Sequence, residues 1–223
     1  QTSPSGGHRG ASLTINGHAT GDPMNSIHFS GILTAQTDGG KVLASDSTIL
    51  INGATEAVIY FVNATSFNGF DKHPVKEGAA YIEQVADDAW HLVNYTYDQL
   101  RQRHIDDYKA IYDRFQLSLG DAVFDTKRTT AQQLKDYTDN KGGNTYLETL
   151  YAQYGRYLLI SCSRTPGVPA NLQGLWTPHL WSPWRGNYTV NINLEENYWP
   201  AEMANMQEMA MPLDNFIAAL AEN

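Results

Sequence analysis

The sequence of 223 residues contains little cysteine, little positive charge and no long hydrophobic run. Its single cysteine, Cys162, cannot form a disulfide within the chain, and its position after the apolar run 158–160 predicts a buried structural thiol rather than a nucleophile. Lysine and arginine total 15 against 24 acidic residues, so the formal net charge is −9. Nucleic acid and anionic membrane surfaces would repel such a chain, and we exclude both as partners.

No run of apolar residues is long enough to span a bilayer, and no signal peptide is recognisable. The chain opens at Gln1 without a methionine, a start consistent with processing, and on that ground we expect a periplasmic or secreted location. We expect neither a metal ion nor a cofactor. The sequence is 42% hydrophobic and 11% aromatic, which is enough to bury the core of one large or two modest domains.

The N-terminal part of the chain has the pattern of an antiparallel β domain. Residues 1–10 lack an apolar period and predict an unordered lead-in. The turn sequence Thr37-Asp-Gly-Gly40 predicts a hairpin, and the nearly continuous apolar character of 56–63 predicts a central strand covered on both faces. Four strands are few for a closed sandwich, so earlier strands of the domain are expected to be missing. Runs rich in β-branched residues place the strands at 11–17, 27–37, 41–51 and 56–64.

From Asp87 onward, apolar residues recur at steps of three and four, which predicts one long helix ending at Leu119-Gly120. Residues 120–142 have little period and predict a loop or linker with room for a short helical turn. Helices then resume, one with a stripe that begins at Tyr146 and another with Pro212 at its start.

The run from Arg164 to Glu202 gathers four of the five tryptophans together with many side-chain amides. Trp176 and Trp184 stand among prolines and glycines without a helical or strand period, so we expect them in a loop. Aromatic rings cover the apolar C–H faces of pyranose rings, and Asn and Gln supply donors and acceptors to the hydroxyls. Trp176 and Trp184 are therefore predicted to bind a sugar. The alternative is that the indoles pack a helical core.

Asn191 and Asn193 lie two residues apart. In an extended segment their side chains would project to the same side, so two amide oxygens could converge on one water about 3 Å away. The alternative is a pair of loop or cap amides that satisfy backbone groups. The neighbours Glu195 and Glu196 would point in different directions on a helix, and we expect them to be solvated or capping carboxylates.

Four segments resemble glycoside hydrolase family 95, the inverting α-L-fucosidases and α-L-galactosidases: His104–Phe115, Tyr154–Ile160, Pro169–Trp176 and Asn191–Glu202. The resemblance covers most of the chain and implies an α+β multidomain fragment. Residues 1–86 would be the C-terminal part of an N-terminal β-sandwich domain, 87–142 a long helical linker, and 143–223 the first helices of an (α/α)6 catalytic barrel. The remainder of the barrel would then belong to the full-length protein.

The resemblance also implies roles for individual residues. The asparagine pair of the family, which holds and polarises the attacking water, maps onto Asn191 and Asn193. The general acid and the aspartate that supports the pair would lie beyond residue 223, so the fragment alone would be inactive. The expected substrate is a fucosylated or L-galactosylated oligosaccharide.

Thr189 departs from the family pattern, because fucosidases of the family commonly have histidine two residues before the first asparagine. A smaller hydroxyl side chain leaves room for the extra hydroxyl of L-galactose without excluding L-fucose. Three alternatives stay open: another (α/α)6 glycosidase, a sugar phosphorylase, and a β-rich carbohydrate-binding module that does not cleave its ligand.

Overall fold

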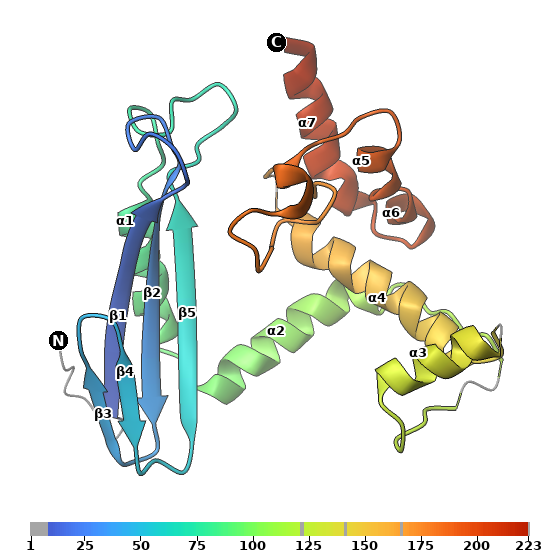
Figure 1. Cartoon of the computed structure of the whole chain (residues 1–223), viewed down its shortest axis with the longest axis horizontal. Helices are drawn as coiled ribbons and strands as arrows, with labels where there is room; N and C mark the ends of the chain where they lie inside the picture. Colours follow the sequence, from blue (N-terminus) through green and yellow to red (C-terminus); the bar gives the residue numbers. More distant parts are fainter. Residues whose placement is uncertain (1–8, 121–122, 141, 166, 223) are drawn as a thin grey trace. The chain divides into compact units, whose positions relative to one another are not determined.

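The computed structural model describes residues 9–120, 123–140, 142–165 and 167–222, and it divides between Arg103 and His104 into two compact units. Antiparallel strands come first and helices follow, as the sequence predicts (Figure 1). Of the predicted lead-in, residues 1–8 lie outside the described residues, whereas Arg9 and Gly10 already belong to the first strand. Within the described residues, no helix combines the length and the hydrophobicity needed to cross a bilayer.

The first unit contains a three-stranded antiparallel sheet of β1 (Arg9–His18), β2 (His28–Thr37) and β5 (Ala57–Thr65), in the order β1-β2-β5. Within the described residues, the prediction of a central strand covered on both faces at 56–63 is wrong. β5 lies at the edge of this sheet, and its residues alternate between exposed and less exposed positions. Ile59 and Phe61 are 60% and 51% exposed, because their face of the strand has no covering element within the described residues.

A small second sheet replaces the single strand predicted at 41–51. β3 (Lys41–Ala44) pairs with β4 (Ile49–Asn52), and the backbone N–H of Ser45 closes the turn between them by donating to the carbonyl of Thr48 at 2.9 Å. The turn at Thr37–Gly40 leads from β2 into β3 without pairing the two strands, so the predicted hairpin is wrong. The carboxylate of Asp38 instead accepts the backbone N–H groups of Thr55 and Glu56, which starts β5 alongside β2.

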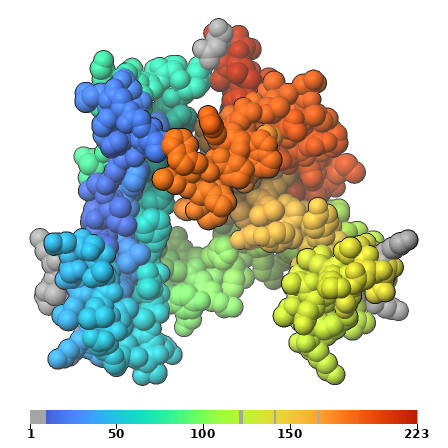
Figure 2. Space-filling view, viewed as in Figure 1, coloured from blue at the N-terminus to red at the C-terminus, as the bar shows by residue number. Residues whose placement is uncertain are grey.

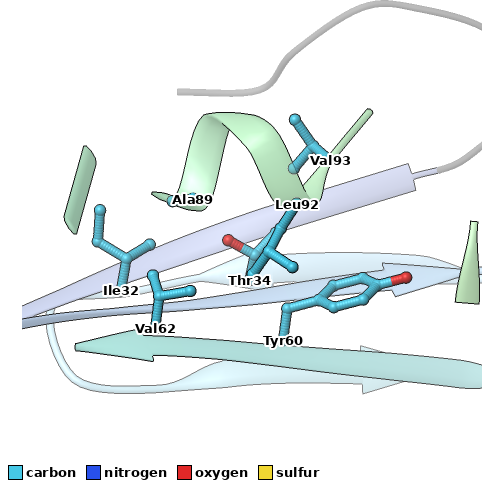
Figure 3. Close-up of a pocket in the computed structure, with 7 residues that line it drawn as sticks. All are labelled: Ile32, Thr34, Tyr60, Val62, Ala89, Leu92 and Val93. Carbon is cyan, nitrogen blue, oxygen red and sulfur yellow. The ribbon is translucent and has the colours of Figure 1, made fainter. Parts of the chain in front are cut away.

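Helix α1 (Tyr81–Leu92) covers one face of the three-stranded sheet. Its residues Ala89 and Leu92, with Val93 just beyond it, face Ile32 and Thr34 of β2 and Tyr60 and Val62 of β5 (Figure 3). The long helix predicted from residue 87 is wrong, because the chain leaves the helical conformation after α1 and starts again at α2 (Tyr97–Tyr112).

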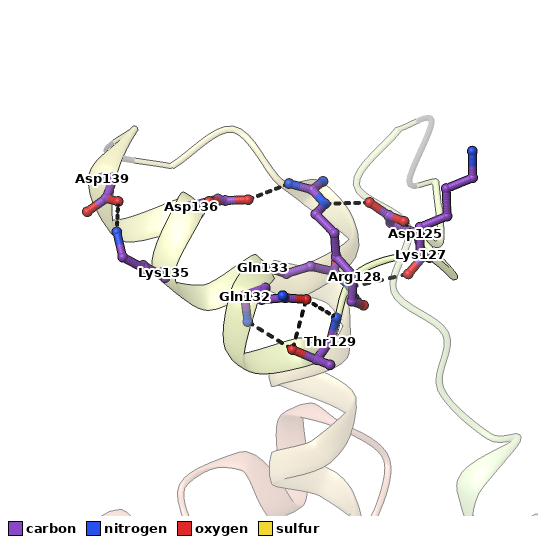
Figure 4. Close-up of polar contacts among 9 residues, drawn as sticks. All are labelled: Asp125, Lys127, Arg128, Thr129, Gln132, Gln133, Lys135, Asp136 and Asp139. Atoms are coloured by element: carbon purple, nitrogen blue, oxygen red, sulfur yellow. Dashed lines mark hydrogen bonds and ion pairs between the residues drawn. The ribbon is translucent and has the colours of Figure 1, made fainter.

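Two capping boxes explain the helix starts that the apolar period does not show. Before α2, the Thr96 hydroxyl accepts the N–H of Gln99 at 3.2 Å, and the Gln99 side chain accepts the N–H of Thr96 at 2.9 Å. Thr129 and Gln132 form the same pair before α3 (Thr130–Asp139), in the segment predicted as a loop. Arg128 links Asp125 to Asp136, which fastens the approach to this helix (Figure 4).

The second unit continues with α4 (Thr145–Ser163), the 3-10 turn η1 (Pro183–Gly186), α5 (Asn193–Glu196) and α6 (Pro200–Met203). The turn η2 (Gln207–Ala210) and α7 (Met211–Glu222) complete it, and Pro212 stands in the first turn of α7, as expected. One buried cluster holds these elements together. Its largest members are Ile111, Leu159, Ile160, Leu194, Tyr198, Met206 and Met209.

Two arginines, one on α4 and one just after it, join this helix to α2. Arg156 is 3% exposed, and its Nη1 donates to the carbonyls of Tyr112 and Phe115 at 3.0 and 3.2 Å, where α2 has ended. Arg164 forms a bidentate ion pair with Asp107, and the hydrogen bond from Arg164 lowers the pKa of that carboxyl group. Cys162, between them on α4, is half-buried and its thiol donates to the Leu159 carbonyl at 3.6 Å.

Candidate active site

The predicted catalytic residues lie in one tight turn between Thr189 and Leu194. The backbone N–H of Leu194 donates to the carbonyl of Thr189 at 3.0 Å, which closes the turn. Leu194 is 1% exposed and anchors the turn in the buried cluster. The structure therefore brings Thr189, Asn191 and Asn193 together, although they do not lie in the extended segment that the sequence predicts.

The backbone of Asn191 and Ile192 differs from a strand. Asn191 has a φ of 76° and Ile192 a φ of 133°, while Asn193 is already the first residue of α5. The strand alternation that would point both amides to one side is absent, so that part of the argument is wrong. Both side chains are exposed, and their proximity follows from the turn instead.

Glu195 holds this turn. Its two carboxylate oxygens accept the backbone N–H groups of Asn191 at 3.0 Å and Ile192 at 2.9 Å, which confirms that it is a capping carboxylate. Hydrogen bonds from its own backbone N–H and from those of Ile192 and Asn191 lower its pKa. At neutral pH Glu195 is therefore ionised and engaged with the backbone, so it cannot serve as the proton donor.

The tryptophans of the loop are exposed rather than packed in a core. Trp176 and Trp184 are 78% and 64% exposed, on a segment that lies at the surface seen in Figure 2 (orange). Within the described residues, these two indoles therefore do not pack into a helical core. Trp184 and Arg185 both adopt the left-handed conformation, with φ of 53° and 55°, and Gly186 continues it at 70°.

Backbone strain is concentrated here. Trp184, Arg185, Asn191 and Ile192 are four of the five non-glycine residues with positive φ in the described chain. Each such residue costs on the order of 1–3 kcal/mol and persists only where its surroundings fix it. Strain of this kind is common at binding and catalytic sites, so the segment 184–192 is a candidate site on conformational grounds alone.

Three side chains that sequence reasoning missed fasten the neighbouring segment Pro169–Asn171 to this turn. Tyr188 donates its hydroxyl hydrogen to the carbonyl of Pro169 at 2.8 Å. The Tyr198 oxygen accepts the N–H of Ala170 at 2.7 Å and is hydrogen bonded to Ser163 at 3.1 Å. Asn197 donates to the carbonyls of Ala170 and Asn171, both at 3.3 Å.

We call Tyr188, Asn197 and Tyr198 the anchoring side chains. Burial raises the pKa of both phenols, so both remain protonated at neutral pH. The spacing of Tyr198 could have predicted its burial. It stands four residues after Leu194, so in a helical turn the two side chains lie on the same, inward-facing side. The anchoring side chains hold the segment that precedes Trp176 against the segment that carries Asn191.

Thr189 is half-buried, and its hydroxyl oxygen accepts a hydrogen bond from the side-chain amide of Asn187 at 2.6 Å. A hydroxyl that accepts this bond keeps its own hydrogen for another acceptor. Among the described residues, no group of three or more histidine, cysteine, aspartate or glutamate side chains could hold a metal ion. The chemical groups gathered here are amides, one hydroxyl and exposed indoles, which suit a neutral, hydroxyl-rich ligand.

A family model described as the glycosyl hydrolase family 95 catalytic domain matches residues 96–223. The chain belongs to glycoside hydrolase family 95. The match starts at Thr96, the residue that caps α2, and includes every element of the candidate site. The family 95 segment therefore begins within the first unit and leaves the strands outside it.

Curated relatives agree with the family. The chain is 34% identical over 181 residues to a probable alpha-fucosidase A of Aspergillus niger. The aligned region is 79% of this chain and 23% of that protein. It is 31% identical over 208 residues to alpha-L-fucosidase 2 of Arabidopsis thaliana, covering 91% of this chain and 24% of that protein. A probable alpha-fucosidase A of Aspergillus oryzae is 36% identical over 143 residues. The chain thus spans less than a quarter of the length of the relatives it matches.

Proposed function

We propose that this chain is part of an inverting glycoside hydrolase that removes terminal α-L-fucose, or α-L-galactose, from oligosaccharides. The observation that carries the proposal is the family 95 match over the turn that holds Asn191 and Asn193. The names of the relatives, all alpha-fucosidases, support fucose as the sugar.

In this mechanism Asn191 and Asn193 position the water that attacks the anomeric carbon. Inversion requires an acid and a base on opposite faces of the sugar, roughly 6.5–9.5 Å apart, with room for a water molecule. An amide is a weak base, so an aspartate must support the pair while a glutamate protonates the leaving oxygen. Both carboxyl groups would come from parts of the full-length protein that this chain does not include, and the chain alone is inactive.

The proposal also includes the architecture: the end of a β-sandwich domain, a helical linker and the start of an (α/α)6 barrel. Exposed apolar side chains support it. Ile59 and Phe61 of β5 are more than half exposed, as are Tyr151 and Tyr154 of α4 at 82% and 54%. Apolar surface of this extent is typical of faces that other elements cover.

Proton NMR of the full-length protein tests the reaction. With an α-L-fucoside as substrate, the first L-fucose released should be the β anomer, which then equilibrates with the α anomer in solution. Initial release of the α anomer would contradict inversion, and no release from either an α-L-fucoside or an α-L-galactoside would contradict the activity. A polypeptide limited to residues 1–223 should release no fucose.

A further inference from the structure

Two side-chain amides in the candidate site point their nitrogen atoms at the same place. The Oδ1 of Asn171 accepts the backbone N–H of Gln173 at 3.2 Å, which fixes the amide and turns its Nδ2 away from the local turn. A Cβ atom added to Gly186 would lie 3.6 Å from this Nδ2 and 3.9 Å from the Nε2 of Gln173. Two donors therefore converge on the space beside the Gly186 Cα.

Neither amide nitrogen donates a hydrogen bond to any part of the chain that the structure describes. The Oε1 of Gln173 is buried and also lacks a partner. The buried oxygen costs stability because it has no compensating bond inside the described part of the chain. The two nitrogens that face Gly186 are both available to donate to a ligand.

Gly186 keeps the space open. Its φ of 70° ends the left-handed run that begins at Trp184, and glycine alone adopts this conformation without strain. Its lack of a side chain also leaves the two amide nitrogens uncovered. The backbone behind them is fixed, because Asn197 donates to the carbonyl of Asn171 and the N–H of Gly174 donates to the same carbonyl at 3.0 Å.

We propose that Asn171 and Gln173 form a hydroxyl-binding subsite, in which both NH₂ groups donate to one oxygen of a neutral sugar lying over Gly186. Two uncharged donors suit a hydroxyl or ring oxygen. The exposed indole of Trp184, two residues from Gly186, supplies an apolar face for the same ring. The inference rests on the proposed function and assigns to these two residues the substrate contact in that site.

Paired glycine variants of the full-length protein test the subsite. Gly186→Ala fills the space, whereas Gly53→Ala is its control, because Gly53 also has a φ of 70° and a Cβ there meets nothing within 4 Å. Both variants carry the same backbone strain and should lose similar thermal stability. With an aryl α-L-fucoside, Gly186→Ala should raise KM roughly tenfold, the effect of one lost hydrogen bond, while Gly53→Ala leaves KM unchanged.

Isosteric variants supply a second, independent measurement. Gln173→Glu keeps the shape of the side chain and replaces the donor by an acceptor, and Asn171→Asp does the same while preserving the Oδ1 that accepts the Gln173 N–H. Each should raise KM about tenfold or more. Gln207→Glu, at an exposed position on η2, adds the same charge and should leave KM unchanged.

The outcomes separate this inference from the proposed function. If the wild-type protein hydrolyses the fucoside but Gly186→Ala and Gln173→Glu behave like their controls, the subsite is wrong and the activity stands. If the wild-type protein hydrolyses neither an α-L-fucoside nor an α-L-galactoside, the proposed function fails and the subsite fails with it.

Discussion

Tyr198→Phe should destabilise the domain measurably, although it removes a single oxygen atom. Tyr198 is 5% exposed, and its oxygen is the acceptor for the N–H of Ala170, which is itself 6% exposed. Phenylalanine fills the same volume, so no cavity opens. The loss is the unsatisfied N–H, which costs about 1–3 kcal/mol. Ser163 also loses a partner, but its hydroxyl still lies 3.5 Å from the sulfur of Cys162, which limits the additional cost.

Hydrogen–deuterium exchange in the full-length protein locates this effect, because the backbone amide of Ala170 loses its acceptor. We expect faster exchange in peptides covering 167–175, together with a lower midpoint of thermal unfolding. Tyr151→Phe is the matched control, since Tyr151 is 82% exposed and its substitution should change stability by less than about 0.5 kcal/mol. Unchanged exchange near Ala170 and an unchanged midpoint in Tyr198→Phe would refute the anchoring role.

Three further predictions concern the proposed reaction in the full-length protein. Asn191→Ala or Asn193→Ala should lower kcat roughly 10²–10⁴-fold with little change in KM, and near-normal turnover in both variants would exclude the water-positioning role. Trp184→Ala should weaken sugar binding in calorimetry while leaving the thermal midpoint nearly unchanged, since the indole is 64% exposed. A large fall in the midpoint with intact binding would indicate a packing role. Thr189→His should shift kcat/KM toward fucosides relative to galactosides by about 1–3 kcal/mol. A strong fucoside preference that is already present in the wild type and is unaltered by histidine would show that Thr189 does not contact the sixth carbon of the sugar.

Hydrophobic periodicity located most of the helices and strands but missed two helix starts. The apolar stripe continues across residues 93–96, so period alone predicts one helix where the structure has two. A different signal was present in both missed places, the sequence Thr-x-x-Gln at Thr96–Gln99 and again at Thr129–Gln132. Each forms a capping box in which side chain and backbone satisfy each other. Local hydrogen bonds therefore determine where α2 and α3 begin, and the spacing of apolar residues does not indicate these hydrogen bonds.

Burial was harder to predict than secondary structure. The run of β5 reads as a strand covered on both faces, yet in this chain it lies at the edge of its sheet with Ile59 and Phe61 exposed. An apolar strand indicates that both of its faces can be buried, but the element that covers a face lies elsewhere in the sequence. The composition of the strand does not predict where that element is.

The candidate site shows the same difference between what local sequence predicts and what tertiary contacts determine. The residue types predict a carbohydrate site with Asn191 and Asn193 as a pair, and this stays a prediction. The extended backbone predicted for the pair is wrong. The turn results from Glu195, whose carboxylate reaches back to two backbone N–H groups, and from Leu194, which is drawn into the core. These are tertiary and capping effects, and strand periodicity is not sensitive to either.

Strain and anchoring in this site come from the same short stretch of sequence. Trp184, Arg185, Asn191 and Ile192 have positive φ, while the residues that hold Pro169–Asn171 in place lie between and just after them, at 188, 197 and 198. A strained segment would relax if its ends were free, and these bonds prevent it. Substitutions in the anchoring side chains should therefore affect both stability and the site, whereas truncation of an exposed indole should weaken ligand binding alone. This difference separates residues that shape the site from residues that bind in it.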